Sequence, residues 1–172
     1  MSLVLTKLIT NSIVKNMDSN KRKELKVSAI RNGTVIDHIP SDKTFQVIRI
    51  LNLESADDPI YFGTAFESKK YGKKGIIKIS NKYFEDYEIS KIAMVAPSAT
   101  LIEINDYEVT RKEKVHIPEF VEKIVVCFNP KCVTNIQGIK TRFRVIEDHN
   151  GEMKLACHYC EKTMKKENIE FF

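Results

Sequence analysis

Four cysteines near the C-terminus have a spacing that could build a metal site. Cys127 and Cys132 are separated by four residues, 24 residues follow, and Cys157 and Cys160 are separated by two. Two close pairs can converge into a cage of four thiolates, the donor set that suits Zn²⁺. Two disulfides or four buried thiols are the alternatives, but a reducing compartment disfavours disulfides, and free thiols rarely occur in two close pairs. We expect one structural zinc ion per chain, because four thiolates leave no coordination position for a substrate.

A second candidate site lies in the segment GTVIDHIP, residues 33–40. Asp37 and His38 stand side by side like a catalytic pair. Adjacent side chains of an extended strand point to opposite faces, however, so we do not expect these two to bond each other. The chain has no G-x-S-x-G, P-loop or dinucleotide-binding motif. A small nucleotide-using enzyme is therefore a weak alternative, and a ligand-binding site is the better interpretation.

Basic residues cluster in two places that could face such a ligand. The first group is Lys69, Lys70, Lys73, Lys74, Lys78 and Lys82, and the second is Arg111, Lys112 and Lys114. Lys78 lies between Ile77 and Ile79 in a predicted strand, so it should project away from the face that they bury. One acid, one histidine and lysines from separate strands suit a nucleoside triphosphate. A solvated surface of unrelated lysines is the alternative, and composition alone slightly favours it.

The order of predicted elements favours an α+β fold in the N-terminal part. Strands are predicted at 25–30 and 34–39, at 60–68 and 75–80, and over a long stretch at 99–109 that bends at 105–106. A helix should begin at Pro40, with Phe45, Ile48 and Leu51 on its sheet-facing side, and a second helix should span 87–96. This βαββαβ order is that of a ferredoxin-like domain.

The C-terminal part reads as a small antiparallel β unit beyond a linker at 115–123. Strands are predicted at 123–128, 141–148, 153–160 and 168–172, and Asn150-Gly151 favours a type I′ hairpin turn. Because this unit has few large apolar side chains, it should need a staple, and zinc would supply one. His158 is expected to be an ordinary surface residue. The predicted organisation is a tail at 1–24, a ligand-binding domain at 25–115 and a zinc domain at 116–172.

Charge is distributed unevenly along the 172 residues, whose formal net charge is +5. Residues 1–26 hold six basic and two acidic residues, residues 27–115 hold thirteen of each, and residues 116–172 hold nine and eight. The folded part is thus almost neutral, and a bound Zn²⁺ with four thiolates adds a charge of −2, which argues against nucleic acid as a partner. A zinc-ribbon nucleic-acid-binding protein remains the alternative function. The basic tail is expected to be a solvated or partner-docking arm.

Hydrophobicity gives no sign of a membrane protein. No apolar run reaches 18 residues, and the N-terminus lacks a clean signal-peptide core and a small-residue cleavage site. We therefore expect a cytoplasmic protein.

Several segments together carry a family resemblance: AIRNGTVIDHIP, GKKGIIKISN, APSATLIEINDYEVTRK and the C-x4-C…C-x2-C unit. From about residue 25 to the end, the chain resembles the regulatory chain of aspartate carbamoyltransferase. The resemblance implies a non-catalytic subunit that controls pyrimidine biosynthesis, with an N-terminal domain that binds CTP and ATP at one site. It also implies a zinc domain that docks on catalytic chains, and a homodimer of regulatory chains.

The resemblance also assigns residues to the nucleotide site. Asp37 and Lys78 would lie near the base and ribose, and His38, Lys74 and Lys112 near the phosphates. The pocket for base and sugar would be lined by Val27, Ile30, Ile104, Tyr107 and Val109. Ile102 stands where the family often carries a polar residue, so we expect weaker discrimination between nucleotides than a typical member shows.

Overall fold

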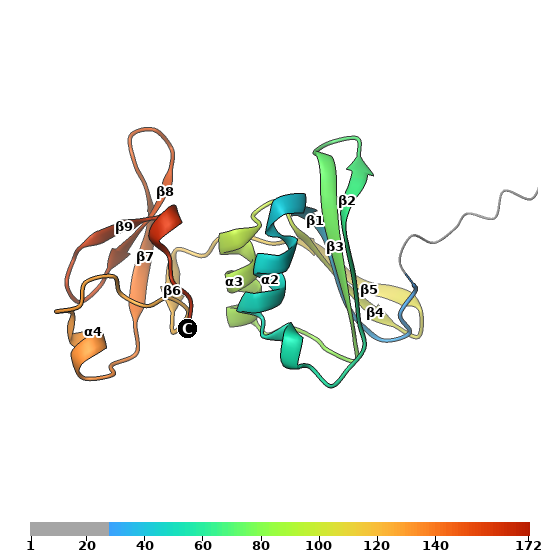
Figure 1. Ribbon diagram of the computed structural model, residues 1–172, viewed down its shortest axis with the longest axis horizontal. Helices are drawn as coiled ribbons and strands as arrows, with labels where there is room; N and C mark the ends of the chain where they lie inside the picture. The colour runs from blue at the N-terminus through green and yellow to red at the C-terminus, as the bar shows by residue number, and fades with distance from the viewer. Residues whose placement is uncertain (1–27) are drawn as a thin grey trace, which may run out of the picture.

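The computed structural model describes residues 28–172, which form two separate antiparallel sheets (Figure 1). The predicted tail at 1–24, the first half of the strand predicted at 25–30, and Val27 lie outside the described residues. Within the described residues, no helix is long and apolar enough to cross a membrane.

The larger sheet has five strands in the order β2-β3-β1-β4-β5. The strands are β1 (Gly33–Pro40), β2 (Ile60–Ser68), β3 (Gly72–Ser80), β4 (Thr100–Asn105) and β5 (Glu108–Lys114). Helices α2 (Thr44–Ile50) and α3 (Asp86–Val95) cover one face, and within residues 28–172 no helix covers the other (Figure 1). The order of β1 to β4 and the two crossover helices are those of a ferredoxin-like fold, and β5 adds a strand at one edge.

The register of the strands shows which side chains of the large sheet lie on its buried face and which lie on its open face. Ile36 pairs with Ile77 on β3 and Leu101 on β4, and all three are fully buried against the helices. One position earlier, Val35 pairs with Lys78 and with Ile102, which lie on the opposite face. The predicted outward projection of Lys78 between two buried isoleucines is therefore confirmed.

The smaller sheet has four strands in the order β6-β7-β8-β9. They are β6 (Phe120–Glu122), β7 (Arg142–Glu147), β8 (Met153–Cys157) and β9 (Thr163–Lys165), and the short helix α4 (Val133–Ile136) precedes β7. The fold class, α+β with a small antiparallel C-terminal sheet, is confirmed.

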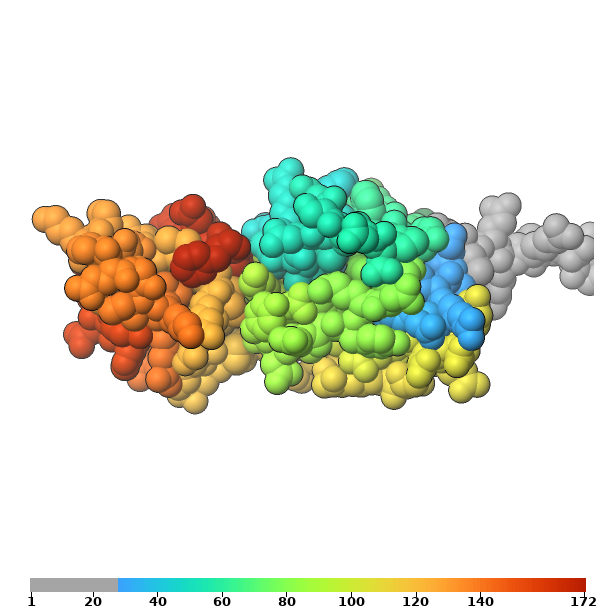
Figure 2. All heavy atoms as spheres, turned by 90° about the horizontal axis from the view of Figure 1, so that it is seen from below, coloured from blue at the N-terminus to red at the C-terminus, as the bar shows by residue number. Residues whose placement is uncertain are grey.

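The C-terminal segment closes the space between the two sheets. The backbone N–H groups of Val126 and Phe172 donate to the carbonyls of Glu170 and Ile124, and Val125 pairs with Phe171 in an isolated bridge. Figure 2 shows these last residues, in dark red, against the helical layer of the large sheet. Phe171 packs against both hydrophobic clusters, and Met94 of α3 belongs to the cluster of the small sheet.

Several predicted elements of the N-terminal part are wrong in detail. Residues 28–30 are not a strand, and β1 begins at Gly33. Pro40 closes β1 with ψ 133°, and α2 begins only at Thr44, after a 3-10 helix at Ser41–Lys43. Phe45 is 55% exposed and stacks edge-on against Phe62 instead of facing the sheet.

The single strand predicted at 99–109 is a hairpin of β4 and β5. Asp106 and Tyr107 both have positive φ, 49° and 68°, as a type I′ turn requires. The Asn32 side chain accepts a hydrogen bond from the Asp106 N–H, and the Arg31 carbonyl accepts one from the Tyr107 N–H. Asn32 and Asp106 are 74 residues apart in the sequence. The local sequence pattern therefore does not reveal this turn.

The small sheet also differs from its prediction. Residues 123–128 and 168–172 contribute only the isolated bridge, whereas β6 lies inside the predicted linker and β9 was not expected. The hairpin between β7 and β8 is confirmed, but its turn is not type I′. Gly151 has a positive φ of 76°, and Asn150 does not; the Gly151 N–H donates to the Asp148 carbonyl.

Candidate ligand-binding site and metal centre

A β-bulge in β1 brings Asp37 and His38 to the same side of the large sheet. Ile36 and Ile39 are both fully buried, so two residues rather than one separate the inward-facing positions. The pairing with β3 shifts between them, and His38 takes a positive φ of 60°. The expectation that the two side chains point to opposite faces is therefore wrong, because it assumed regular strand geometry.

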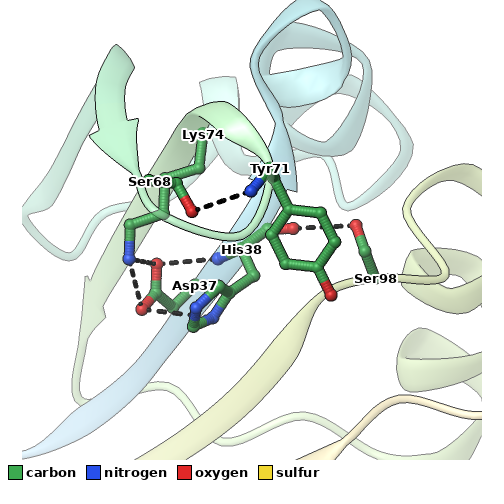
Figure 3. Close-up of polar contacts among 6 residues, drawn as sticks. All are labelled: Asp37, His38, Ser68, Tyr71, Lys74 and Ser98. Carbon is green, nitrogen blue, oxygen red and sulfur yellow. Dashed lines mark hydrogen bonds and ion pairs between the residues drawn. The ribbon is translucent and has the colours of Figure 1, made fainter.

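Asp37 is the centre of a polar cluster (Figure 3). Its carboxylate accepts two hydrogen bonds from Lys74 Nζ, at 2.6 and 2.8 Å, and one from the His38 N–H at 2.7 Å. His38 Nδ1 lies 3.4 Å from Asp37 Oδ2, but this buried nitrogen forms no hydrogen bond. The Ser98 hydroxyl donates to the His38 carbonyl at 2.9 Å. The cluster fixes the bulge and leaves the imidazole able to bind a further partner.

A cavity of about 360 Å³ opens beside His38. It is lined from β5 by Lys112 and Lys114, and from the tip of the β2–β3 hairpin by Lys70 and Tyr71. Ser98 and Thr100 complete the wall at the start of β4. Volume and charge suit a small polyanion. Its one acidic lining residue, Glu113, forms an ion pair with Arg111 at 2.7 Å.

The structure brings some of the residues predicted for a nucleotide site together and separates others. Asp37, His38 and Lys74 are in contact, and Lys112 shares the cavity with His38. Lys78 and Ile104 lie on the open face of the sheet, and Lys78 Nζ donates to the Ser28 carbonyl at 2.8 Å. Burial lowers the pKa of Lys78, although the negative charge of Asp37 opposes the shift.

Three further predicted residues lie away from this cavity. Tyr107 and Val109 are 66% and 60% exposed at the β4–β5 turn, at the other end of these strands from Lys114. Ile30 is buried before β1 begins. Sequence reasoning missed Tyr71, Ser98 and Thr100, and only the aromatic residue inside the basic segment KKYGKK gave a signal.

The four cysteine sulfurs converge within 4.8 Å of one another in the small-sheet region. Cys127 lies 3.7 Å from Cys160, and Cys132 lies 3.8 Å from Cys157, measured between sulfurs. A tetrahedral site with Zn–S bonds of about 2.3 Å has sulfurs about 3.8 Å apart, whereas a disulfide bond is about 2.05 Å long. The donor set and its spacing therefore fit one tetrahedral metal ion. His158 is exposed and outside the cluster.

Two loops hold the sulfurs in place. Asn135 donates to the carbonyls of Cys127 and Asn129, at 2.7 and 2.9 Å, and so closes the first loop. The Glu161 N–H donates to the Cys157 carbonyl and closes the second. The Thr134 hydroxyl donates to Cys132 Sγ at 3.2 Å, a bond that strengthens when the sulfur is a thiolate.

Burial and hydrogen bonds together set the protonation of the metal-free thiols. Burial raises the pKa of Cys127 and of Cys157. Burial acts in the same direction on Cys160, but hydrogen bonds from the Lys162 backbone, the Asn129 side chain and neighbouring thiols bring the pKa of Cys160 to about 7. Metal binding therefore has to displace protons, as is usual for thiolate sites.

Comparison with known protein families matches the chain in two parts. Residues 25–116 match the allosteric domain of the aspartate carbamoyltransferase regulatory chain, and residues 119–170 match its metal binding domain. The chain belongs to the aspartate carbamoyltransferase regulatory chain family. The catalytic activity of aspartate carbamoyltransferase resides on separate catalytic chains. The four-cysteine site of this chain is a structural zinc site.

Curated relatives cover nearly the whole chain. The regulatory chain of Phocaeicola vulgatus is 51% identical over 152 residues, 88% of this chain and 97% of its own length. That of Bacteroides fragilis is 50% identical over 151 residues, with the same coverage. That of Pyrococcus horikoshii is 46% identical over 148 residues, 85% of this chain and 96% of its own length. The alternatives of a nucleic-acid-binding protein and a small enzyme are thereby set aside.

Proposed function

We propose that residues 25–115 form the domain that binds CTP and ATP competitively, at the bulge of β1 and the adjoining cavity. The observation that carries this proposal is the cavity itself, where His38 faces lysines from β5 and from the β2–β3 hairpin. Within the described residues, Lys70, Lys112 and Lys114 form no ion pair with a carboxylate. Their charges are therefore available for phosphate oxygens.

The open face of the sheet beside Asp37 would receive the ribose and the base. In one row across the sheet lie Lys78, Val35, Ile102 and Lys112, so an apolar centre is flanked by two lysines. Ile102 offers no side-chain hydrogen bond to a base edge. CTP and ATP should therefore differ less in affinity here than at a site with a polar residue at this position.

Calorimetry on the full zinc-loaded chain tests this assignment. Lys112→Ala should weaken CTP and ATP binding together, by about 1–3 kcal/mol, because a charge-assisted bond is lost. Asp37→Ala should weaken both and change their ratio. Lys140→Ala, an exposed lysine of the small-sheet region, is the control. The assignment is wrong if Lys112→Ala binds both nucleotides like the control.

Residues 116–172 are proposed to dock on the catalytic chains. Phe128 and Tyr159 support this, because both are large side chains, 48% and 41% exposed, next to zinc-binding cysteines. Replacing Cys157 with Ala, or treating the thiolates with a mercurial, should release the catalytic chains from the assembled enzyme. Size-exclusion chromatography would reveal this, and an assembly that stays intact after complete zinc removal would contradict it.

A homodimer of regulatory chains completes the proposal. The edge strand β2 supports it, because Tyr61 and Phe62 are 38% and 48% exposed there, and an open edge favours pairing with a second copy. A Phe62→Lys variant should sediment as a monomer if this edge is used. Because the four cysteines form a metal site and no disulfide, as is typical of reducing compartments, we place the protein in the cytoplasm.

Regulation requires that a nucleotide favour one of two states of the assembled enzyme. Linkage then demands that an active-site ligand change nucleotide affinity by the same factor. The test is to titrate CTP and ATP into the complex with and without a bisubstrate-like inhibitor. Identical affinities in the two conditions, for both nucleotides, would make this chain a scaffold instead of a regulator.

A further inference from the structure

The tip of the β2–β3 hairpin is built to stand over the bulge of β1. The Tyr71 N–H donates to the Ser68 hydroxyl at 3.3 Å, the Lys73 N–H donates to the Tyr71 carbonyl at 2.9 Å, and Gly72 supplies the positive φ of 71°. The Tyr71 ring meets the His38 ring edge-on, with centroids 5.8 Å apart (Figure 3). The turn residues and one aromatic contact thus fix where the tip lies.

This arrangement delivers Lys70 to the cavity and keeps Lys74 out of it. Lys70 lines the cavity, with its ammonium group 5.2 Å from the centroid of the Tyr71 ring. Lys74 is not among the lining residues, and two of its hydrogen bonds go to the Asp37 carboxylate. The charge of Lys74 is thereby largely balanced before any ligand arrives. Lys70 has no carboxylate partner within residues 28–172.

We infer that Lys70 reads the length of an effector's phosphate chain, whereas the charge of Lys74 is already paired with Asp37. This rests on the nucleotide-binding function proposed above. Lys112 and Lys114 come from β5, and Lys70 comes from the hairpin, so the cavity has cations on two walls. One phosphate needs only one wall, whereas a triphosphate can engage both. Each added phosphate also adds negative charge, which Lys70 can neutralise.

The ratio of CTP to CMP affinity distinguishes a specific role of Lys70 from a general loss of positive charge. Calorimetric titrations of CMP, CDP and CTP into the full zinc-loaded chain are compared between wild type and variants. Lys70→Ala should weaken CTP about tenfold and CMP less than about twofold, as expected for one lost charge-assisted bond. Lys70→Arg should keep the wild-type ratio of CTP to CMP affinity, because the charge remains.

The chain offers a matched control one residue away. Lys69 is exposed and does not line the cavity, so Lys69→Ala should leave all three affinities unchanged. Tyr71→Ala removes the ring beside Lys70 and should lower the same ratio, whereas Tyr71→Phe should preserve it.

The outcomes separate this inference from the function on which it rests. If wild type binds none of the three nucleotides, the proposed function fails, and the inference fails with it. If wild type binds CTP but Lys70→Ala weakens CMP and CTP by the same factor, or matches Lys69→Ala, the inference alone is overturned.

Discussion

The two sheets of this protein bury their interiors by different means. The large sheet packs seventeen buried residues, nearly all aliphatic, between its strands and two helices. The cluster of the small sheet has ten buried residues; three are cysteines of the metal site, and one, Met94, is borrowed from α3. A core as small as the second rarely supplies enough free energy by burial alone. Burial thus stabilises the allosteric domain, whereas metal coordination stabilises the metal binding domain.

Metal removal should therefore give the largest effect, confined to the small sheet. Zinc binding contributes about 10–16 kcal/mol in comparable thiolate sites, which exceeds the stability of most domains. Cys157→Ala or a chelator should abolish hydrogen-exchange protection in β7 and β8 and leave β1 and β3 protected. His158→Ala, an exposed neighbour of Cys157, is the matched control. Protection of β7 and β8 without metal would show that metal coordination does not stabilise the small sheet.

The substitution that should destabilise the large sheet, and not the small one, lies in the core of the large sheet. Ile36 is fully buried, so Ile36→Ala should cost about 2–5 kcal/mol of its stability. Val35→Ala, on the open face one residue earlier, should cost less. Zinc should stay bound in both variants, which a colorimetric zinc assay can follow during denaturant unfolding. Zinc release that coincides with the unfolding of β1 in Ile36→Ala would show that the two regions do not fold independently.

Regular patterns were predictable from the sequence, and long-range geometry was not. Alternation of Ile77, Lys78 and Ile79 revealed which face of β3 is buried, and cysteine spacing revealed the metal centre. The bulge at His38 escaped prediction, since the buried Ile36 and Ile39 are recognised as inward-facing only once β3 is paired beside them.

The same limit explains what was missed at the candidate site. Tyr71 was missed, and Lys70 was named only as one of six lysines. Both reach the cavity because the β2–β3 hairpin leans over β1, and the sequence predicts the hairpin without its direction. Lys74 was predicted to lie near the phosphates, and the sequence did not reveal that its ammonium group binds Asp37. A charged residue can be counted from sequence, but its partner depends on neighbours that are distant along the chain.

Phe171 is the residue at which the separation of the two sheets breaks down. It packs against both clusters, so Phe171→Ala should cost about 1–3 kcal/mol, less than a fully buried phenylalanine. The loss should also make the two regions unfold at more widely separated denaturant concentrations. Phe172→Ala is the control, because that side chain is 64% exposed. Equal effects of the two substitutions on both transitions would remove Phe171 as the link.

The smallest expected effect lies in the β7–β8 hairpin of the small sheet, at Asp148. Its carboxylate accepts hydrogen bonds from Lys154 Nζ at 2.9 Å, which also forms an ion pair with it, and from the N–H groups of Glu152 and Asn150. These partners, Lys154 first, lower the pKa of Asp148 in the folded chain. Because the pKa is lowered by folding, the stabilisation that Asp148 contributes is complete above its pKa in the unfolded chain, about 3.9. That stabilisation is lost as pH falls through its pKa in the folded chain. Asp148→Asn should therefore destabilise the hairpin slightly at neutral pH, where the carboxylate is charged. Glu152→Gln keeps the backbone donor and should change nothing. Thermal unfolding of the zinc-loaded chain at neutral pH, together with hydrogen exchange of the hairpin amides, measures the difference.

If Asp148→Asn proves as damaging as Cys157→Ala, the hairpin's own hydrogen bonds stabilise the small sheet as much as its metal does, and the contrast between the two sheets is lost.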